Sequence, residues 1–168
     1  MHPEILNENQ KELLNLINKF YKGYYLVGGT AIAMHLGHRR SIDFDLFTAT
    51  KINHTAIKNQ LAISKFRYSL IVQKPDQIHF IVNSVKLTFF NFPFKISIST
   101  KYHEAFKMPD LLTLAAMKAF ALGGRGKWKD YVDLYFILKN HYTLNEICQK
   151  ATSIFGDSFS PYLFQKQI

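Results

Sequence analysis

Hydrophobic residues near the start of the chain recur at helical spacing. Leucine, isoleucine and phenylalanine side chains within residues 4–20 are separated by polar positions, which predicts an amphipathic helix. Residues 24–27 then form a short apolar run, typical of a strand, that stops at Gly28 and Gly29. The chain is therefore expected to open with a helix and a strand that ends in a glycine turn.

The middle of the chain alternates between helical and strand-like patterns. Thr30 can cap a helix over residues 31–36, and Gly37 is suited to end it because glycine readily adopts left-handed backbone angles. Residues 42–47 form the pattern of a second strand, and residues 53–63 that of another helix. Three strand-like runs follow, near residues 66–73, 77–82 and 85–92.

The last third of the chain is helical in pattern. One helix opens near Pro109 and runs to about Leu122, and another covers residues 127–139. A third should begin at Thr143, whose spacing to Glu146 is that of a capping box. Because strands come early and helices late, we predict an α+β fold with a helical C-terminal part.

Length and composition fit one compact unit. The 168 residues are 48% hydrophobic and 15% aromatic, enough for a substantial core. We therefore expect a single domain over residues 1–168, with a catalytic core at about 24–92 and a helical part at about 109–168. The lone cysteine, Cys148, excludes an intramolecular disulfide and cysteine-based zinc sites.

Charge and hydropathy narrow the classes of partner. No apolar run approaches the roughly 18 residues of a membrane span, and the first residues do not resemble a secretory leader. We therefore expect a cytoplasmic protein without a membrane partner. The net charge of +9 favours an anionic partner, such as RNA, DNA or a nucleotide, although a basic surface can serve solubility alone.

The glycine turn and the strand after it carry the richest chemistry. Glycines at Gly28 and Gly29 let backbone N–H groups approach phosphate oxygens, and the start of a helix favours an anion. Asp43 and Asp45 are two residues apart on a predicted strand, so their side chains share one face. Two adjacent carboxylates repel each other unless a cation lies between them, and Mg²⁺ prefers oxygen ligands together with phosphates. The sequence thus predicts a phosphate-binding turn beside a metal site.

Lys118 is the one charged residue in an otherwise apolar helix. A helix that is apolar on every side is normally buried, and a buried ammonium group needs an anion nearby. That anion can be Asp130 or Asp133, or it can be a substrate phosphate, and the side chain can also reach outward to water. Spacing alone does not decide among these. Beside the phosphate and metal motifs, we favour the phosphate.

Two aspartates lie three residues apart on the next predicted helix. Asp130 and Asp133 share one helical face with apolar residues, so they need partners such as Lys118, Arg125 or a metal. The alternative is that they only complement the positive N-terminus of the helix, which fits Asp130 better than Asp133. We expect one of the two to be functional.

In the order in which they occur, these motifs resemble the AbiEii/AbiGii-type nucleotidyltransferase toxin family of the polymerase-β-like nucleotidyltransferase superfamily. The match comprises Gly-Gly-Thr-Ala from Gly28, Arg-x-Ser-x-Asp-x-Asp-Leu-Phe from Arg39, Lys-Ala at Lys118, and Arg-Gly-x-x-Lys-Asp-x-x-Asp-Leu from Arg125. Each motif alone is weak, but their matching order over residues 24–139 is specific. The resemblance implies a small mixed sheet flanked by helices.

The resemblance also implies roles for individual residues. Gly28, Gly29 and Thr30 would hold a nucleoside triphosphate (NTP), while Asp43 and Asp45 would bind Mg²⁺ or Mn²⁺. Further contacts to the nucleotide and its phosphates would come from Arg39, Ser41 and Lys118, and Asp130 would be the acid of the last motif. The acceptor in such toxins is RNA, such as the tRNA 3′ end, and a cognate antitoxin protein would accompany the toxin.

One position departs from the superfamily pattern. Polymerase-β-like enzymes usually carry a third carboxylate on a later strand, where this chain has Thr88, and no acid occurs between Asp76 and Glu104. Deprotonation of the attacking hydroxyl then falls to Asp130 or to solvent. The alternative function is therefore a catalytically weakened module of the same fold that binds nucleotide or RNA without turnover. A distant third is an antibiotic-modifying enzyme, but the positive surface would repel a cationic aminoglycoside.

Three nearby residues have plainer interpretations. His35 and His38 are too isolated for a metal site, and we expect His38 to contact phosphate or solvent. Arg39 can equally form a salt bridge to Asp43 or Asp45.

Overall fold

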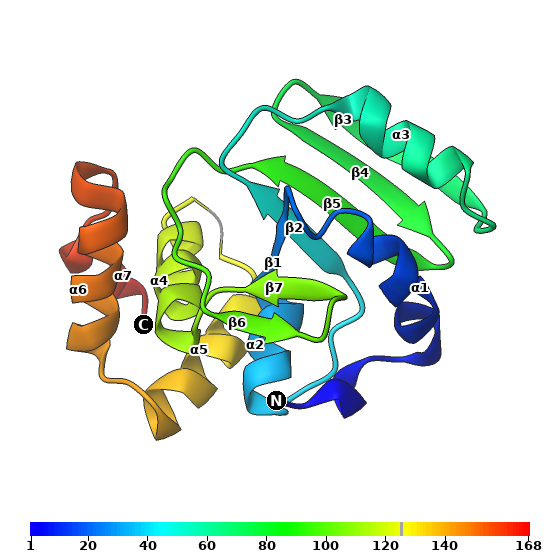
Figure 1. Ribbon diagram of the computed structural model, residues 1–168. Coiled ribbons are helices and arrows are strands. Elements are labelled where there is room, and N and C mark those ends of the chain that lie inside the picture. Colours follow the sequence, from blue (N-terminus) through cyan, green and yellow to red (C-terminus); the bar gives the residue numbers. More distant parts are fainter. Residues whose placement is uncertain (125) are drawn as a thin grey trace.

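The computed structural model describes residues 1–124 and 126–168, and its centre is a five-stranded sheet (Figure 1). The strand order is β1-β2-β5-β4-β3, and all neighbours are antiparallel except the parallel pair β2 and β5. The strands are β1 (Tyr25–Val27), β2 (Phe44–Thr48), β3 (Tyr68–Lys74), β4 (Gln77–Val82) and β5 (Val85–Asn91). A two-stranded hairpin, β6 (Thr100–Tyr102) and β7 (Phe106–Met108), lies next to β1.

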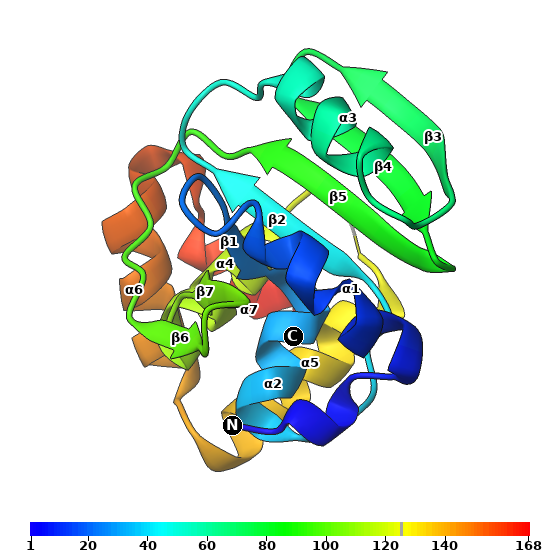
Figure 2. The same cartoon turned by 45° about the vertical axis from the view of Figure 1, so that its right-hand side comes forward.

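Helices are arranged around this sheet in two groups. Figure 2 shows α1 (Glu8–Asn18) and α3 (His54–Ala62) in front of the sheet. The second group contacts β1 and β2 through α2 (Gly28–Leu36), which packs on α4 (Leu111–Leu122) and α5 (Trp128–Asn140). The chain continues through α6 (Leu144–Phe155) and α7 (Pro161–Gln167), both of which contact α4. Single-turn 3₁₀ helices cover Pro3–Ile5 and Gly156–Ser158.

The two faces of the sheet differ in burial. Alternate residues of β4 are buried, so Phe80 faces the core, together with Phe89 of β5, whose ring is 4.7 Å from that of Phe20. The opposite face carries Asp45, Thr88 and His79, which are paired in register across β2, β5 and β4. We call this the open face, because the side chains on it are mostly half-buried and polar.

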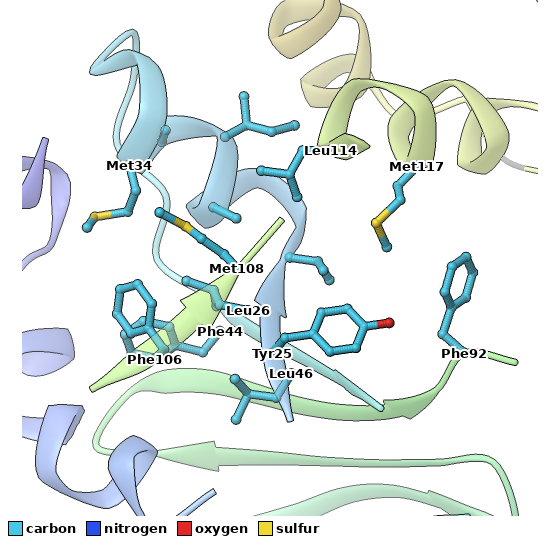
Figure 3. Close-up of a cluster of buried hydrophobic side chains, with 14 of the residues drawn as sticks. Tyr25, Leu26, Met34, Phe44, Leu46, Phe92, Phe106, Met108, Leu114 and Met117 are labelled. Atoms are coloured by element: carbon cyan, nitrogen blue, oxygen red, sulfur yellow. The ribbon is translucent and has the colours of Figure 1, made fainter. Parts of the chain in front are cut away.

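One part of the core lies where β1, β2 and β7 meet α2 and α4. Figure 3 shows apolar side chains from β1, β2, β7, α2 and α4 that meet there, among them Leu26, Phe44, Met108 and Leu114. Burial of these side chains, each worth about 1.5–3 kcal/mol, holds α2 and α4 against the sheet. This packing fixes the position of the glycine turn relative to the strands.

Most predicted elements are confirmed, with shifted ends. Gly37 ends α2 in a left-handed conformation, and Thr143 and Glu146 form the predicted capping box. The predicted cap at Thr30 is wrong, because α2 begins at Gly28 and the Thr30 side chain bonds elsewhere. Asp43 lies one residue before its strand rather than within it. The β6–β7 hairpin and α7 were not expected.

The predicted α+β fold with a small mixed sheet and a helical C-terminal part is confirmed. Across residues 1–124 and 126–168, no helix combines the length and apolar character that crossing a membrane requires.

Candidate active site

The glycine turn between β1 and α2 touches one of the two aspartates directly. Gly28 has a φ of +72°, a backbone conformation that residues with a Cβ rarely adopt. A Cβ built on Gly28 would lie 2.5 Å from Asp45 Oδ2. The Asp45 carboxylate therefore packs against the bare backbone of the turn, and the predicted phosphate and metal motifs meet in space.

The loop between α2 and β2 is held against the same turn. The buried Thr30 Oγ1 lies 2.9 Å from Ser41 Oγ and also donates to the backbone carbonyl of Asp43. A Cβ on Gly29 would overlap the Arg39 guanidinium and would come within 3.3 Å of Ser41 Oγ. Arg39 and Ser41 thus lie over Gly29, and their nucleotide-binding roles stay predictions.

Asp45 occupies an unfavourable position for a charged group. Burial raises the pKa of the Asp45 carboxyl above its ordinary value, and the negative charge of Asp43 raises it further. The Thr88 hydroxyl and the positive charges of Lys86 and Lys118 act in the opposite direction. Asp45 therefore lies within electrostatic reach of both Asp43 and Lys118.

The position of the expected third carboxylate is resolved by the strand register. Thr88 pairs directly with Asp45 across the parallel strands β2 and β5, so both side chains lie on the open face. The buried Thr88 Oγ1 lies close enough to Asp45 to affect its pKa, but it makes no hydrogen bond of ordinary geometry among the described residues. The chain thus has a hydroxyl near the position where the resemblance led us to expect an acid.

These donors fit a divalent cation that is only partly held by protein. In the described part of the chain, no three acidic, histidine or cysteine side chains gather as a complete metal site. Two carboxylates and an unpartnered hydroxyl nevertheless form an oxygen-rich donor set, and Mg²⁺ commonly takes one or two carboxylates with water and phosphate oxygens. A cation there would also relieve the repulsion between Asp43 and Asp45.

Lys118 is buried between the two aspartates of α5. Its Nζ atom donates to Asp130 Oδ1 at 2.8 Å and lies 3.0 Å from Asp133 Oδ2. Lys118 is therefore paired with both of the aspartates that the sequence offered as its possible partners. Asp130 Oδ2 has no partner among the described residues, while the predicted partner Arg125 lies outside them.

Asp133 is the centre of a buried ionic cluster. Arg39 donates from Nε to Asp133 Oδ1 at 2.7 Å and from Nη2 to Oδ2 at 2.9 Å, and His38 Nε2 lies 2.8 Å from Oδ1. Burial alone would raise the pKa of Asp133, but the bonds from His38 and Arg39 and the charge of Lys118 hold it well below its ordinary value. We call these residues, with Asp130, the Asp133 cluster.

Two predictions about this loop are wrong. Arg39 forms its salt bridge with Asp133 rather than with Asp43 or Asp45, and His38 is buried against Asp133 and Phe136 instead of facing phosphate or solvent. Asp133 lies 94 residues from Arg39 and 95 residues from His38 along the chain, so local spacing could not predict these contacts. His79, in register with Thr88, was also missed, although its alternation with apolar neighbours in β4 marked it as facing away from the core.

Sequence comparison relates the chain to an uncharacterized protein. No family model matches the chain. The uncharacterized protein aq_aa25 of Aquifex aeolicus (strain VF5) is 30% identical over 142 residues, which cover 81% of this chain and 68% of that protein.

Solved structures share the fold at low sequence identity. JHP933 from Helicobacter pylori has a TM-score of 0.63 and 19% identity, with 88% of this chain and 75% of that chain covered. MenT4, a nucleotidyltransferase toxin from Mycobacterium tuberculosis H37Rv, has a TM-score of 0.58 and 15% identity, covering 88% and 63%. The Megavirus polyadenylate synthase has a TM-score of 0.52 and 17% identity, covering 84% and 33%. The fold is the polymerase-β-like nucleotidyltransferase fold; the resemblance to AbiEii/AbiGii-type toxins stays a prediction.

Proposed function

The chain belongs to the family of the Aquifex aeolicus protein aq_aa25, and from its fold and the geometry of its candidate site we propose that it is a metal-dependent nucleotidyltransferase. It transfers a nucleoside monophosphate from an NTP to an acceptor hydroxyl. The observation that carries the proposal is the contact between Asp45 and the Gly28 backbone, within the field of Lys118. This contact supports a site in which the glycine turn, the two acids and Lys118 act on one triphosphate.

The triphosphate binds at the start of α2. Gly28 and Gly29 present backbone without side chains, and the first N–H groups of a helix favour phosphate oxygens. Arg39, which lies over Gly29, adds a guanidinium suited to phosphate, and Ser41 adds a hydroxyl. Thr30 positions this loop through its bonds to Ser41 and to the Asp43 carbonyl.

Asp43 and Asp45 would hold Mg²⁺ or Mn²⁺, which supplies charge neutralisation and alignment of the α-phosphate. The acceptor oxygen forms a bond to the α-phosphorus, the bond from that phosphorus to the bridging oxygen breaks, and pyrophosphate leaves. The hydroxyl proton passes to solvent or to Asp130, whose second carboxylate oxygen has no partner among the described residues.

Lys118 contacts the phosphates in this proposal, and Asp130 and Asp133 position its ammonium group. Its charge already acts on Asp45, which supports a location beside the metal site. A purely structural Lys118 would instead serve only to neutralise the two acids. The two roles predict different effects on NTP affinity.

The acceptor is RNA, such as the tRNA 3′ end, and the protein acts as the toxin of a toxin–antitoxin pair. The net charge of +9 supports an anionic acceptor. The order of the motifs, which resembles AbiEii/AbiGii-type toxins, supports the toxin role and a cognate antitoxin protein as partner. The likeness in fold to MenT4, a nucleotidyltransferase toxin, is in keeping with this proposal.

A second candidate follows from Thr88. If the hydroxyl cannot replace the usual acid, the same site would bind nucleotide or RNA without turnover. The two candidate functions are distinguished by whether labelled nucleotide is transferred to an acceptor.

The test is incubation with labelled NTPs, Mg²⁺ and total tRNA. We expect label on RNA with the wild-type protein, its loss with Asp43→Asn, and its retention with Asp76→Asn, an exposed acid in the β3–β4 turn that serves as the matched control. NTP binding without labelled product under any condition would favour the binding module. Label that persists in Asp43→Asn would refute the proposed site.

The role of Lys118 needs a variant that keeps the buried charges balanced. Lys118→Gln combined with Asp130→Asn removes one charge of each sign, so the fold should persist. We expect this double variant to lose NTP affinity relative to Asp130→Asn alone, as measured by calorimetry. Equal affinities would assign Lys118 a structural role.

A further inference from the structure

The outward face of α5 carries exposed aromatic side chains. Trp128 is 79% exposed and Tyr135 is 56% exposed, and their spacing of seven residues places them on the same side of the helix. Large aromatic side chains dominate binding energetics when they are covered, so two of them left in water on one helix point to a ligand. The buried face of α5, by contrast, holds Asp130 and Asp133.

The aromatic side chains stand on the same helix as residues of the candidate site. Trp128 is the first residue of α5, and Asp130, which accepts from Lys118, follows in the same turn on the buried side. A shallow groove of about 520 Å³ begins at Tyr131, one turn after Trp128, and continues along the helix. Its lining comprises Tyr131, Leu134, Tyr135, Leu138, Lys139 and Ile168.

The exposed charges around this surface are positive. Lys127 and Lys129 flank Trp128, and Lys139 Nζ lies 5.6 Å from the centre of the Tyr135 ring. The acids within the helix are buried and paired, so they do not offset these lysines at the surface. Aromatic faces interleaved with lysines suit a ligand that has flat bases and a negative backbone, which a purely apolar protein partner lacks.

We propose that Trp128, Tyr135 and the groove that Tyr135 lines bind the unpaired terminal nucleotides of the acceptor strand and lead its end to the active site. This inference rests on the proposed function, because it supplies the acceptor surface for that reaction. Bases stack on Trp128 and Tyr135, while Lys127, Lys129 and Lys139 contact phosphates. The groove is compatible with any base sequence, since every base has a face that can stack.

Trp128 is the only tryptophan of the chain, so it reports directly on this surface. We expect a short single-stranded RNA to quench its fluorescence, and a blunt duplex of the same sequence to do so much less. A dye-labelled strand followed by anisotropy should show that Trp128→Ala raises Kd about 5- to 100-fold, with Tyr135→Ala in the same direction. Trp128→Phe, which keeps an aromatic face, should recover part of this loss.

Tyr68→Ala provides the matched control, since Tyr68 is an exposed aromatic on β3, the edge strand at the far side of the sheet from α2 and α5. It should leave Kd unchanged. Single-stranded DNA of the same sequence tests whether the surface requires RNA or binds any unpaired strand. Unquenched fluorescence, or equal Kd values for the wild type and Trp128→Ala, would overturn the inference and leave the surface to another class of partner, such as a protein.

The outcome is separable from that of the transfer assay. RNA that quenches Trp128 without ever receiving label would refute transfer while supporting the surface. Label that reaches RNA equally in the wild type and Trp128→Ala would support transfer and refute the surface.

Discussion

Replacing Asp133 with alanine removes the carboxylate that four buried interactions share. Arg39 donates to it twice, while His38 and Lys118 each contribute one contact. Counting lysine, arginine and aspartate only, the Asp133 cluster is neutral, because Lys118 and Arg39 balance Asp130 and Asp133. The alanine variant leaves one positive charge without a partner in a site where Lys118 is only 8% exposed.

Loss of one partner from a buried pair costs about 3–5 kcal/mol. The Arg39 side chain retains 17% exposure and can be partly rehydrated, so we expect the lower end of that range. For a chain of this length, about 2–4 °C of melting temperature accompanies each kcal/mol, which predicts a fall of about 6–12 °C. Urea unfolding followed by circular dichroism measures the free energy, and thermal melting gives an independent value.

The exposed Asp157 supplies the control, because Asp157→Ala should change stability by less than about 0.5 kcal/mol. The combination of Arg39→Ala with Asp133→Ala should cost less than the sum of the single variants, since both remove the same bonds. A loss below about 1 kcal/mol for Asp133→Ala would refute the reasoning, because the cluster would then exchange its partners freely with water.

The remaining predictions concern the turn and the response to acid. Gly28→Ala should abolish nucleotide binding and destabilise the fold by about 1–3 kcal/mol, because its Cβ would meet Asp45 and its φ is positive. Calorimetry measures the binding and thermal melting measures the stability. Gly23→Ala, which has open space around it, should change neither. Wild-type behaviour of Gly28→Ala would contradict the close contact. The pKa of Asp133 is lower in the folded protein than in the unfolded chain, where it is about 3.9. Asp133 therefore stabilises the fold at pH values above about 3.9, and this stabilisation is lost as the pH falls toward the pKa of the folded state. Unfolding free energies measured from pH 6 to pH 3 should therefore fall more steeply for the wild type than for Asp133→Asn, and parallel curves would exclude this assignment.

The fold was largely predictable because its elements follow local rules. The strand at residues 77–82, the capping box at Thr143 and the helix end at Gly37 are properties of neighbouring residues, and the structure confirms them. The β6–β7 hairpin was missed because its strands are three residues long and its turn uses His103 at a positive φ rather than glycine. Nothing in the local pattern marks such a turn.

The candidate site, like the fold, could be predicted only where local sequence rules decide the structure. The proximity of Asp45 to the glycine turn could be expected from the order of the motifs, and the structure shows this contact. Strand periodicity did not place Asp43 correctly, because β2 begins one residue after it. The partners of Arg39 and Thr30 could not be predicted, because a guanidinium or hydroxyl bonds whatever the tertiary fold brings near. Thr30 therefore bonds to the loop that leads into β2 and does not cap its own helix.

The bonds from His38 and Arg39 to Asp133 have a consequence for biosynthesis. They tie the loop that leads into the aspartate motif to a helix that leaves the ribosome 94 residues later. A nascent chain that has completed only the five strands already contains both glycines and both aspartates, yet its loop is held only by Thr30 and lacks the bonds to Asp133. The loop would therefore reach its final position only when α5 docks.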